Sequence, residues 1–222
     1  MKMIILKILF VALILAGIVA MELMLDKNKA TKIAFLGDSI TEFGWLQESG
    51  YVRKVSQGLN SAGIHFELIP AGIAGNTTYD MLQRLDKDVL DKKPDIVFLM
   101  GGINDIWHYS ADTKIFSNNV KNIIDRINEH GAKPIIISLT LITEDISAPE
   151  NKKIDEFNKF LKEYTSKNGI LYIDVNTAFK NELKKYNNMS GVLTIDGVHL
   201  NDKGNQILAD TILTEFLKTY KP

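Results

Sequence analysis

The chain has 222 residues, and its 26 Lys and Arg against 27 Asp and Glu give a formal net charge of −1. Its composition, 45% hydrophobic and 24% charged with 15 Gly and 5 Pro, excludes disordered and collagen-like chains and suits a domain with a sizeable core. The near-neutral charge and scarcity of Arg argue against nucleic-acid binding, and the absence of Cys excludes disulfides, thiolate-bound metals and a thiol nucleophile.

The first 21 residues have the composition of a targeting segment. Lys2 and Lys7 precede an unbroken apolar run over residues 8–21. A positive start and an apolar run of this length are typical of a signal peptide or of a membrane anchor, with a tether through residues 4–21. Both interpretations predict an extracytoplasmic protein, either secreted or held at the outer face of the cytoplasmic membrane. A buried first helix of the domain is the alternative.

Residues 22–30 form a short polar spacer, and residues 31–222 are expected to be one domain, because they contain no repeat and no flexible linker. In this part, continuously apolar runs alternate with helical patterns, which predicts an α/β fold with an open parallel sheet and helices on both faces. The predicted strands occupy residues 33–36, 66–69, 96–100, 135–139 and 171–175. Helical spacing covers residues 81–89, 120–127, 154–164 and 207–217.

Ligands of such sheets bind beyond the carboxyl ends of the strands, so the residues that follow each strand are candidates for a site. Gly37-Asp38-Ser39 follows the first strand and would place a serine hydroxyl at the tip of that strand, beside a helix N-terminus. A turn with a helix cap is the alternative for this motif.

The next two strands are followed by further candidates. A glycine-rich segment that contains Gly75 could offer bare backbone N–H groups to an oxyanion or a phosphate, although a turn capped by Thr77 or Thr78 has the same pattern. Asn104, after the third strand, could aim an amide N–H at a developing negative charge or form an Asx turn.

Asp196 and His199 lie three residues apart, just before the last predicted helix. In a turn, the carboxylate can accept from Nδ1–H of the imidazole and leave Nε2 free to act as a base. Metal binding would need further ligands, and the other histidines show no paired ligand spacing, so no metal site is predicted.

These four blocks, in this order and spacing, resemble the SGNH or GDSL-type hydrolase family of esterases and lipases. The motifs are G-D-S-I-T from Gly37, the Gly75 block, G-x-N-D from Gly102 and D-G-V-H from Asp196. One variation is Ile40, where the nickname of the family has Leu. The resemblance covers nearly the whole chain after the leader, and it implies a flavodoxin-like three-layer α/β/α sandwich.

The resemblance also implies a role for each matching residue. Ser39 would attack an ester carbonyl, His199 would accept and return its proton, and Asp196 would orient His199. The N–H groups of Ser39 and Gly75, with the side chain of Asn104, would form the oxyanion hole. No metal or organic cofactor is implied.

The substrate is less closely defined. Asp38, Trp107 and His108 are candidate substrate contacts, and aromatic residues in segments 42–50 and 106–110, among them Phe43 and Trp45, could form a rim or belong to the core. We expect removal of a short acyl group, such as acetyl, from an extracytoplasmic carbohydrate. A lysophospholipase, a thioesterase, an O-acyltransferase with the same triad and a non-catalytic binding module are the alternatives. The sequence leaves the oligomeric state open.

Overall fold

The structure is a computed structural model that describes residues 30–108, 112–187 and 189–220, the side chain of His108 excepted. The leader predicted for residues 1–21 and nearly all of the spacer lie outside the described residues. Among the described helices, none has the length and apolarity needed to cross a bilayer.

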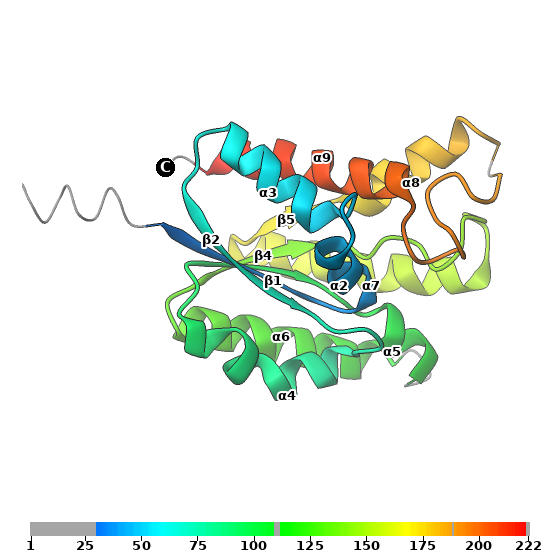
Figure 1. Cartoon of the computed structure of the whole chain (residues 1–222). Helices are drawn as coiled ribbons and strands as arrows, with labels where there is room; N and C mark the ends of the chain where they lie inside the picture. Colours follow the sequence, from blue (N-terminus) through cyan, green and yellow to red (C-terminus); the bar gives the residue numbers. More distant parts are fainter. Residues whose placement is uncertain (1–29, 109–111, 188, 221–222) are drawn as a thin grey trace, which may run out of the picture.

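Five strands form one parallel sheet in the order β2-β1-β3-β4-β5, which confirms the predicted fold class (Figure 1). β1 lies between β2 and β3, so the chain reverses its direction across the sheet after β2, and ligands bind at such a switch point in doubly wound folds. The strands are β1 Thr31–Gly37, β2 Phe66–Gly72, β3 Ile96–Met100, β4 Lys133–Ile137 and β5 Leu171–Ile173.

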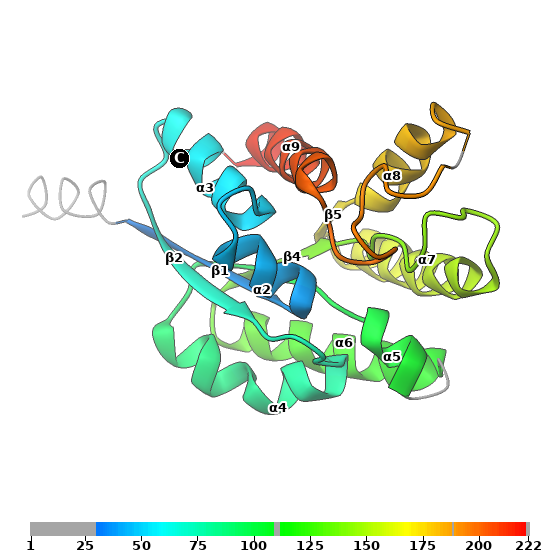
Figure 2. The same ribbon diagram turned by 45° about the vertical axis from the view of Figure 1, so that its right-hand side comes forward.

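Helices cover both faces of the sheet. Figures 1 and 2 show α3 beside α9 on one face and α4 beside α6 on the other. The longer helices are α2 Ser39–Leu46, α3 Tyr51–Ser61, α4 Thr78–Asp88, α6 Thr113–Glu129, α7 Pro149–Asn168, α8 Val175–Lys184 and α9 Asp202–Thr219. The shorter ones are a 3-10 turn, Leu90–Lys92, and α5 Ile103–His108.

Stacked aromatic rings join the layers of the core. Phe35 of β1 stacks on Phe98 of β3 with ring centroids 4.7 Å apart, and Phe98 meets Phe216 of α9 edge-on. On the other face, Phe116 of α6 stacks on Phe157 of α7. All five rings are buried, so burial of apolar area holds α9 against the sheet and α6 against α7.

Two of the predicted strands end two residues earlier in the structure, whereas the strand predicted for residues 66–69 continues to Gly72. The strand predicted to reach residue 175 ends at Ile173, because Asp174 accepts a hydrogen bond from the N–H of Thr177 and starts α8. The strand predicted for residues 135–139 spans 133–137. Beyond it, the N–H of Leu139 donates to the side chain of Asn158 rather than to a neighbouring strand.

Candidate active site

The carboxyl ends of β1, β2 and β3 meet at one edge of the sheet. Gly37, the last residue of β1, pairs in register with Gly72 of β2 and Met100 of β3. A Cβ at Gly37 would lie 2.6 Å from the carbonyl oxygen of Met100, and one at Gly72 would lie 2.3 Å from the backbone nitrogen of Glu42. These glycines therefore let α2 begin directly against the strand ends, which brings the three predicted motifs together.

Ser39 is the first residue of α2. The carboxylate of Asp38 caps this helix by accepting from the N–H of Ile40 at 3.0 Å. The N–H of Ser39 lies at the positive end of the helix dipole. Both interpretations of the motif therefore hold, because Asp38 supplies the cap and Ser39 the hydroxyl.

Asp196 and His199 occupy the loop before α9, and the loop brings them to Ser39. One oxygen of Asp196 accepts from the N–H groups of Val198 and His199, at 3.0 and 2.8 Å. Its other oxygen lies 2.6 Å from Nδ1 of His199, and Nε2 of His199 lies 3.0 Å from Oγ of Ser39. The three side chains thus form a continuous hydrogen-bonded line, although 160 residues separate Ser39 from His199.

This line defines the tautomer of His199. Partial burial acts to raise the pKa of Asp196, but hydrogen bonds from the ring and backbone of His199 and from Val198 outweigh it, so the pKa lies below its ordinary value. Asp196 is therefore ionised at neutral pH and can only accept hydrogen bonds. Nδ1 of His199 must carry the proton, and Nε2 is free to accept the hydroxyl proton of Ser39.

Glu144, for which the sequence predicted no role, holds this loop in place through hydrogen bonds to residues 192–194. Its buried carboxylate accepts from the N–H groups of Val192, Leu193 and Thr194, at 2.9, 2.6 and 2.6 Å, and from the hydroxyl of Thr194 at 2.8 Å. Burial acts to raise the pKa of Glu144, but these four bonds together lower it. No sequence pattern pointed to Glu144, because its partners lie about 50 residues further along the chain.

Gly75 and Asn104 lie beside Ser39 and offer hydrogen-bond donors. Gly75 has a φ of 77°, which favours glycine, and its N–H has no hydrogen-bond partner among the described residues. The side-chain amide of Asn104 donates one hydrogen to the carbonyl of Asn76 at 3.0 Å, which leaves its second hydrogen without a partner in the described part of the chain. Thr77 caps α4 in a capping box with Asp80, so the cap interpretation of this segment also holds.

Asp105, the last residue of the G-x-N-D motif, belongs to a second group, for which no role was predicted and which lies behind Asn104. Asp105 is buried and accepts hydrogen bonds from the backbone and the hydroxyl of Thr78, and Asn119 donates to that hydroxyl at 3.1 Å. Burial raises the pKa of Asp105, against the hydrogen bonds from Thr78. This network joins α5, which carries Asn104, to the first turn of α4.

A cavity of about 310 Å³ opens over these groups. Six of the eight predicted site residues line it: Asp38, Ser39, Gly75, Asn104, Trp107 and His199. Apolar side chains complete its wall: Ile40, Phe43, Ala74, Ile103 and Val198. A small, largely apolar chamber next to a nucleophile suits a short acyl group.

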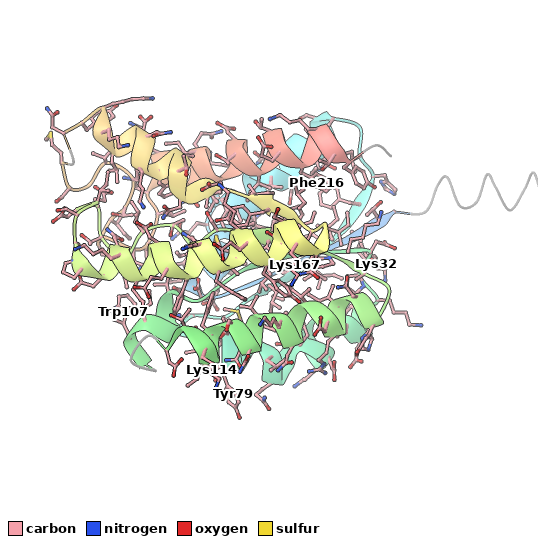
Figure 3. All side chains as sticks on the ribbon, turned by 180° about the vertical axis from the view of Figure 1, so that it is seen from behind. Lys32, Tyr79, Trp107, Lys114, Lys167 and Phe216 are labelled. Carbon is pink, nitrogen blue, oxygen red and sulfur yellow. The ribbon has the colours of Figure 1, made fainter. Side chains whose placement is uncertain are left out.

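The candidate substrate contacts differ in their surroundings. Asp38 is buried, and burial raises its pKa to about 7 against the hydrogen bond from Ile40 and the proximity of His199. Trp107 lines the cavity, and 55% of it is exposed. Lys32, which is near the start of β1, lies at the opposite end of the molecule from Trp107 (Figure 3). The side chain of His108 lies outside the described residues.

Of the other aromatic residues expected at a rim, Phe43 and Trp45 have different positions. The ring of Phe43 lines the cavity, 5.2 Å from the ring of His199. Trp45 packs against the core, and the guanidinium of Arg53 lies 4.5 Å from its ring, so of the two alternatives Trp45 takes the core position.

The amino end of the sheet has a larger cavity, of about 530 Å³, between α6, α7 and α9. Its lining includes Tyr164, Phe216 and Tyr220 but no serine or histidine, so it lacks the pair that lines the smaller cavity. In residues 30–108, 112–187 and 189–220, no three acidic or histidine side chains are grouped so that they could hold a metal ion.

Comparisons with known proteins agree with this site. The model of the GDSL-like Lipase/Acylhydrolase family matches residues 35–207. An acetylxylan esterase from Geobacillus stearothermophilus is 27% identical over 206 residues, which cover 83% of this chain and 93% of the relative. Esterase TesA from Pseudomonas aeruginosa is 28% identical over 131 residues, or 59% of this chain and 65% of the relative.

Solved structures extend the likeness to three dimensions. A crystal structure of an acetyl xylan esterase, AlAXEase, superposes with a TM-score of 0.76 at 34% identity and covers 82% of this chain and 98% of its own. A crystal structure of a Geobacillus stearothermophilus acetylxylan esterase gives the same TM-score at 25% identity and covers 86% and 96% of the two chains. Because the family model spans most of the sequence and the fold agrees, this chain belongs to the GDSL-like lipase/acylhydrolase family and is a hydrolase of ester bonds.

Proposed function

We propose that the protein is a serine esterase that removes acetyl groups from an extracytoplasmic carbohydrate through an acyl-enzyme. The observation that carries the proposal is the hydrogen-bonded line from Asp196 through His199 to Ser39, with the donors of Gly75 and Asn104 beside it. Two solved variants described as catalytic mutants of the Geobacillus enzyme replace a serine and a histidine, which supports these roles for Ser39 and His199.

In the first half of the reaction, Oγ of Ser39 attacks the ester carbonyl while Nε2 of His199 takes the hydroxyl proton. The oxyanion that forms accepts hydrogen bonds from the N–H groups of Ser39 and Gly75 and from the amide of Asn104. When the carbon–oxygen bond to the alcohol breaks, His199 gives its proton to the leaving oxygen, and the acyl group stays on Ser39.

In the second half, water replaces the alcohol. His199 removes a proton from the water, which attacks the acyl-enzyme, and the same donors stabilise the second oxyanion. Collapse of this intermediate returns the proton to Ser39 and releases the acid. Ionised Asp196 stabilises the imidazolium form of His199 in both halves.

The acetyl group and the carbohydrate rest on separate arguments. The cavity of about 310 Å³ suits a short acyl chain, and exposed Trp107 offers a flat apolar surface of the kind on which a sugar ring packs. The acetylxylan esterases among the relatives support the same substrate class. Asp38 and His108 remain proposed contacts.

The location outside the cytoplasm is proposed from the leader. Residues 1–21 have the pattern of a signal peptide or anchor, and a 34% identical relative that matches 36% of this chain is described as a lipoprotein of Bacillus subtilis. The amino end of β1 lies at the end of the sheet opposite to the cavity. A tether through residues 4–21 would therefore join the domain away from the site. Fractionation of cells that express the full chain should find it outside the cytoplasm, and a cytoplasmic pool alone would contradict this.

The test of the activity compares wild type with Ser39→Ala. Ser166→Ala, at an exposed position on α7, is the matched control. Acetylated xylo-oligosaccharides and p-nitrophenyl acetate, butyrate and octanoate are the substrates. We expect wild type and Ser166→Ala to release acetate from the oligosaccharide and to prefer p-nitrophenyl acetate, while Ser39→Ala is inactive. Preference for octanoate would favour the lipid-directed alternative, and activity in Ser39→Ala would overturn the proposal.

A further inference from the structure

The loop that carries Gly75 joins β2 to α4 and is held on both sides of Gly75 by side chains. Before it, the N–H of Ala74 donates to the carboxylate of Glu42, on α2, at 2.9 Å. After it, Asn76 receives two hydrogen bonds: its carbonyl accepts from Asn104, and its side-chain oxygen accepts from Nε of Arg84 at 2.6 Å. Gly75 thus has its place set by its neighbours, while its own N–H has no partner in the described part of the chain.

Arg84 makes more contacts than this one. It projects from α4, its side chain is only 13% exposed, and one terminal nitrogen donates to the carbonyl oxygens of Gly37 and Ala71, both at 2.9 Å. The other terminal nitrogen donates to Asp88 at 3.1 Å. A single guanidinium therefore contacts the end of β1, the end of β2 and the loop of Gly75.

The positions of these acceptors relate Arg84 to the chemistry. Gly37 lies two residues before Ser39, and Asn76 directly follows Gly75. A planar guanidinium with donors in a rigid fork defines the distance between such acceptors, whereas the ammonium of a lysine is a point charge with three rotating donors. Arg84 touches neither the cavity nor the line from Ser39 to Asp196.

We propose that Arg84 is a positioning residue, which fixes the N–H of Gly75 relative to Ser39 by binding Asn76 and Gly37 at once. This inference rests on the proposed roles of Ser39 and Gly75. An oxyanion donor contributes mainly in the transition state, so a misplaced N–H lowers kcat and leaves KM nearly unchanged. Arg84 makes no hydrogen bond to His199, so its replacement leaves the contacts from Asp196 through His199 to Ser39 in place.

The experiment measures kcat and KM for p-nitrophenyl acetate in wild type, Arg84→Lys, Arg84→Ala and Asp88→Asn. Asp88→Asn is the matched control, because it weakens the outer ion pair and leaves the three bonds that face the site. We expect the two Arg84 variants to lose kcat by about 10- to 100-fold, less than removal of a donor, with KM within about 3-fold. Asp88→Asn should stay within about 2-fold of wild type in both.

Three further measurements separate positioning from general damage to the fold. The acid limb of the pH profile of kcat/KM, which reports His199, should not shift in the Arg84 variants. Added guanidinium ion should restore part of the kcat of Arg84→Ala, and the same salt should not activate wild type. In a double-mutant cycle, Asn76→Ala combined with Arg84→Ala should be no slower than the slower single variant.

Wild-type kcat in a folded Arg84→Ala, a loss confined to KM, or additive effects in the cycle would each overturn the inference. If Arg84→Ala does not fold, Arg84→Lys and Asn76→Ala provide the same test. A wild-type enzyme without Ser39-dependent turnover would overturn the proposed function itself. That result is distinct from Ser39-dependent turnover that is insensitive to Arg84.

Discussion

The two halves of the site are built in different ways. One half consists of Ser39 and the donors of Gly75 and Asn104, which come soon after the carboxyl ends of three paired strands. Gly37 pairs with both neighbouring strands, so the sheet fixes where the segments that carry these residues begin. Asp196 and His199 lie in an irregular loop, where an isolated bridge between Thr194 and Leu200 is the only strand-like pairing among the residues that the structure describes. The first half starts from the strand ends and is then held by side chains such as Arg84, whereas the second half has no paired strand beside it and is held by the side chain of Glu144.

Glu144 shows what this difference means for the loop. One carboxylate receives four hydrogen bonds from residues 192–194, so a single ionisable group holds the segment that leads to Asp196. Loops with few regular hydrogen bonds open locally at low cost. We therefore expect the two halves to differ in how mutation and pH affect them.

The largest loss of activity should come from mutation of Ser39 and His199, where the two halves of the site meet. Ser39→Ala and His199→Ala should each lower kcat by at least about 10⁴-fold, because each removes a member of one proton-transfer unit. The double variant should be no slower than either single variant, in steady-state assays with p-nitrophenyl acetate. Independent, multiplying losses would mean that the hydrogen bond from the hydroxyl of Ser39 to Nε2 of His199 has no part in the reaction.

Within the half built on the strand ends, Asn104→Ala should lower kcat by about 10²- to 10³-fold with little change in KM, because we propose that its amide binds the developing oxyanion. The free energy of unfolding should fall by only about 1 kcal/mol, for the lost bond to Asn76. Kinetics and urea denaturation of the same preparation measure both. A large loss of stability with unchanged kcat would assign Asn104 to the fold alone.

Within the loop half, Glu144→Gln should affect both properties. The amide has one acceptor oxygen and places its NH₂ against backbone donors, so we expect a loss of about 1–3 kcal/mol in stability and about 10-fold in kcat. Glu163→Gln, on an exposed part of α7, is the control and should change neither. Equal stability in the two variants would show that the four bonds do not hold the loop.

The last prediction is a pH dependence of stability that has opposite sign in the two halves. The pKa of Glu144 is lowered in the folded protein, so its stabilisation is present above its unfolded pKa and is lost as pH falls through the folded value. The pKa of Asp38 is raised from 3.8 to about 7, so the folded state binds the extra proton and stability falls as pH rises between these values.

Asp38→Asn keeps a side-chain oxygen for the cap and removes this titration. Its stability relative to wild type should increase from about pH 4 to about pH 7 and then level off, measured by denaturation across that range. Relative to wild type, Glu144→Gln should lose its disadvantage as the solution becomes acidic. A constant difference for Asp38→Asn would show that Asp38 ionises normally in the folded protein.

The sequence predicted the half of the site with Ser39, Gly75 and Asn104 well, because these residues follow strands that short stretches of sequence identify. Continuous apolar runs marked the strands, and parallel strands bring their carboxyl ends to one edge, so Ser39, Gly75 and Asn104 were expected together. It was less accurate where a single side chain ends an element, as at Asp174, whose cap stops the last strand two residues early.

By itself, then, the sequence determined the fold class, the family motifs and the residues that the motifs name, because these depend on periodicity and on spacing along the chain. Only the tertiary structure decided what holds those residues in place: Glu144 under the Asp196–His199 loop, Arg84 between two strand ends and Asn76, and Asp105 behind Asn104. Each of these is a polar group whose partners lie on other elements. Such hydrogen bonds satisfy buried donors and acceptors that exist only once the chain has folded, so they leave no periodic signal in the sequence.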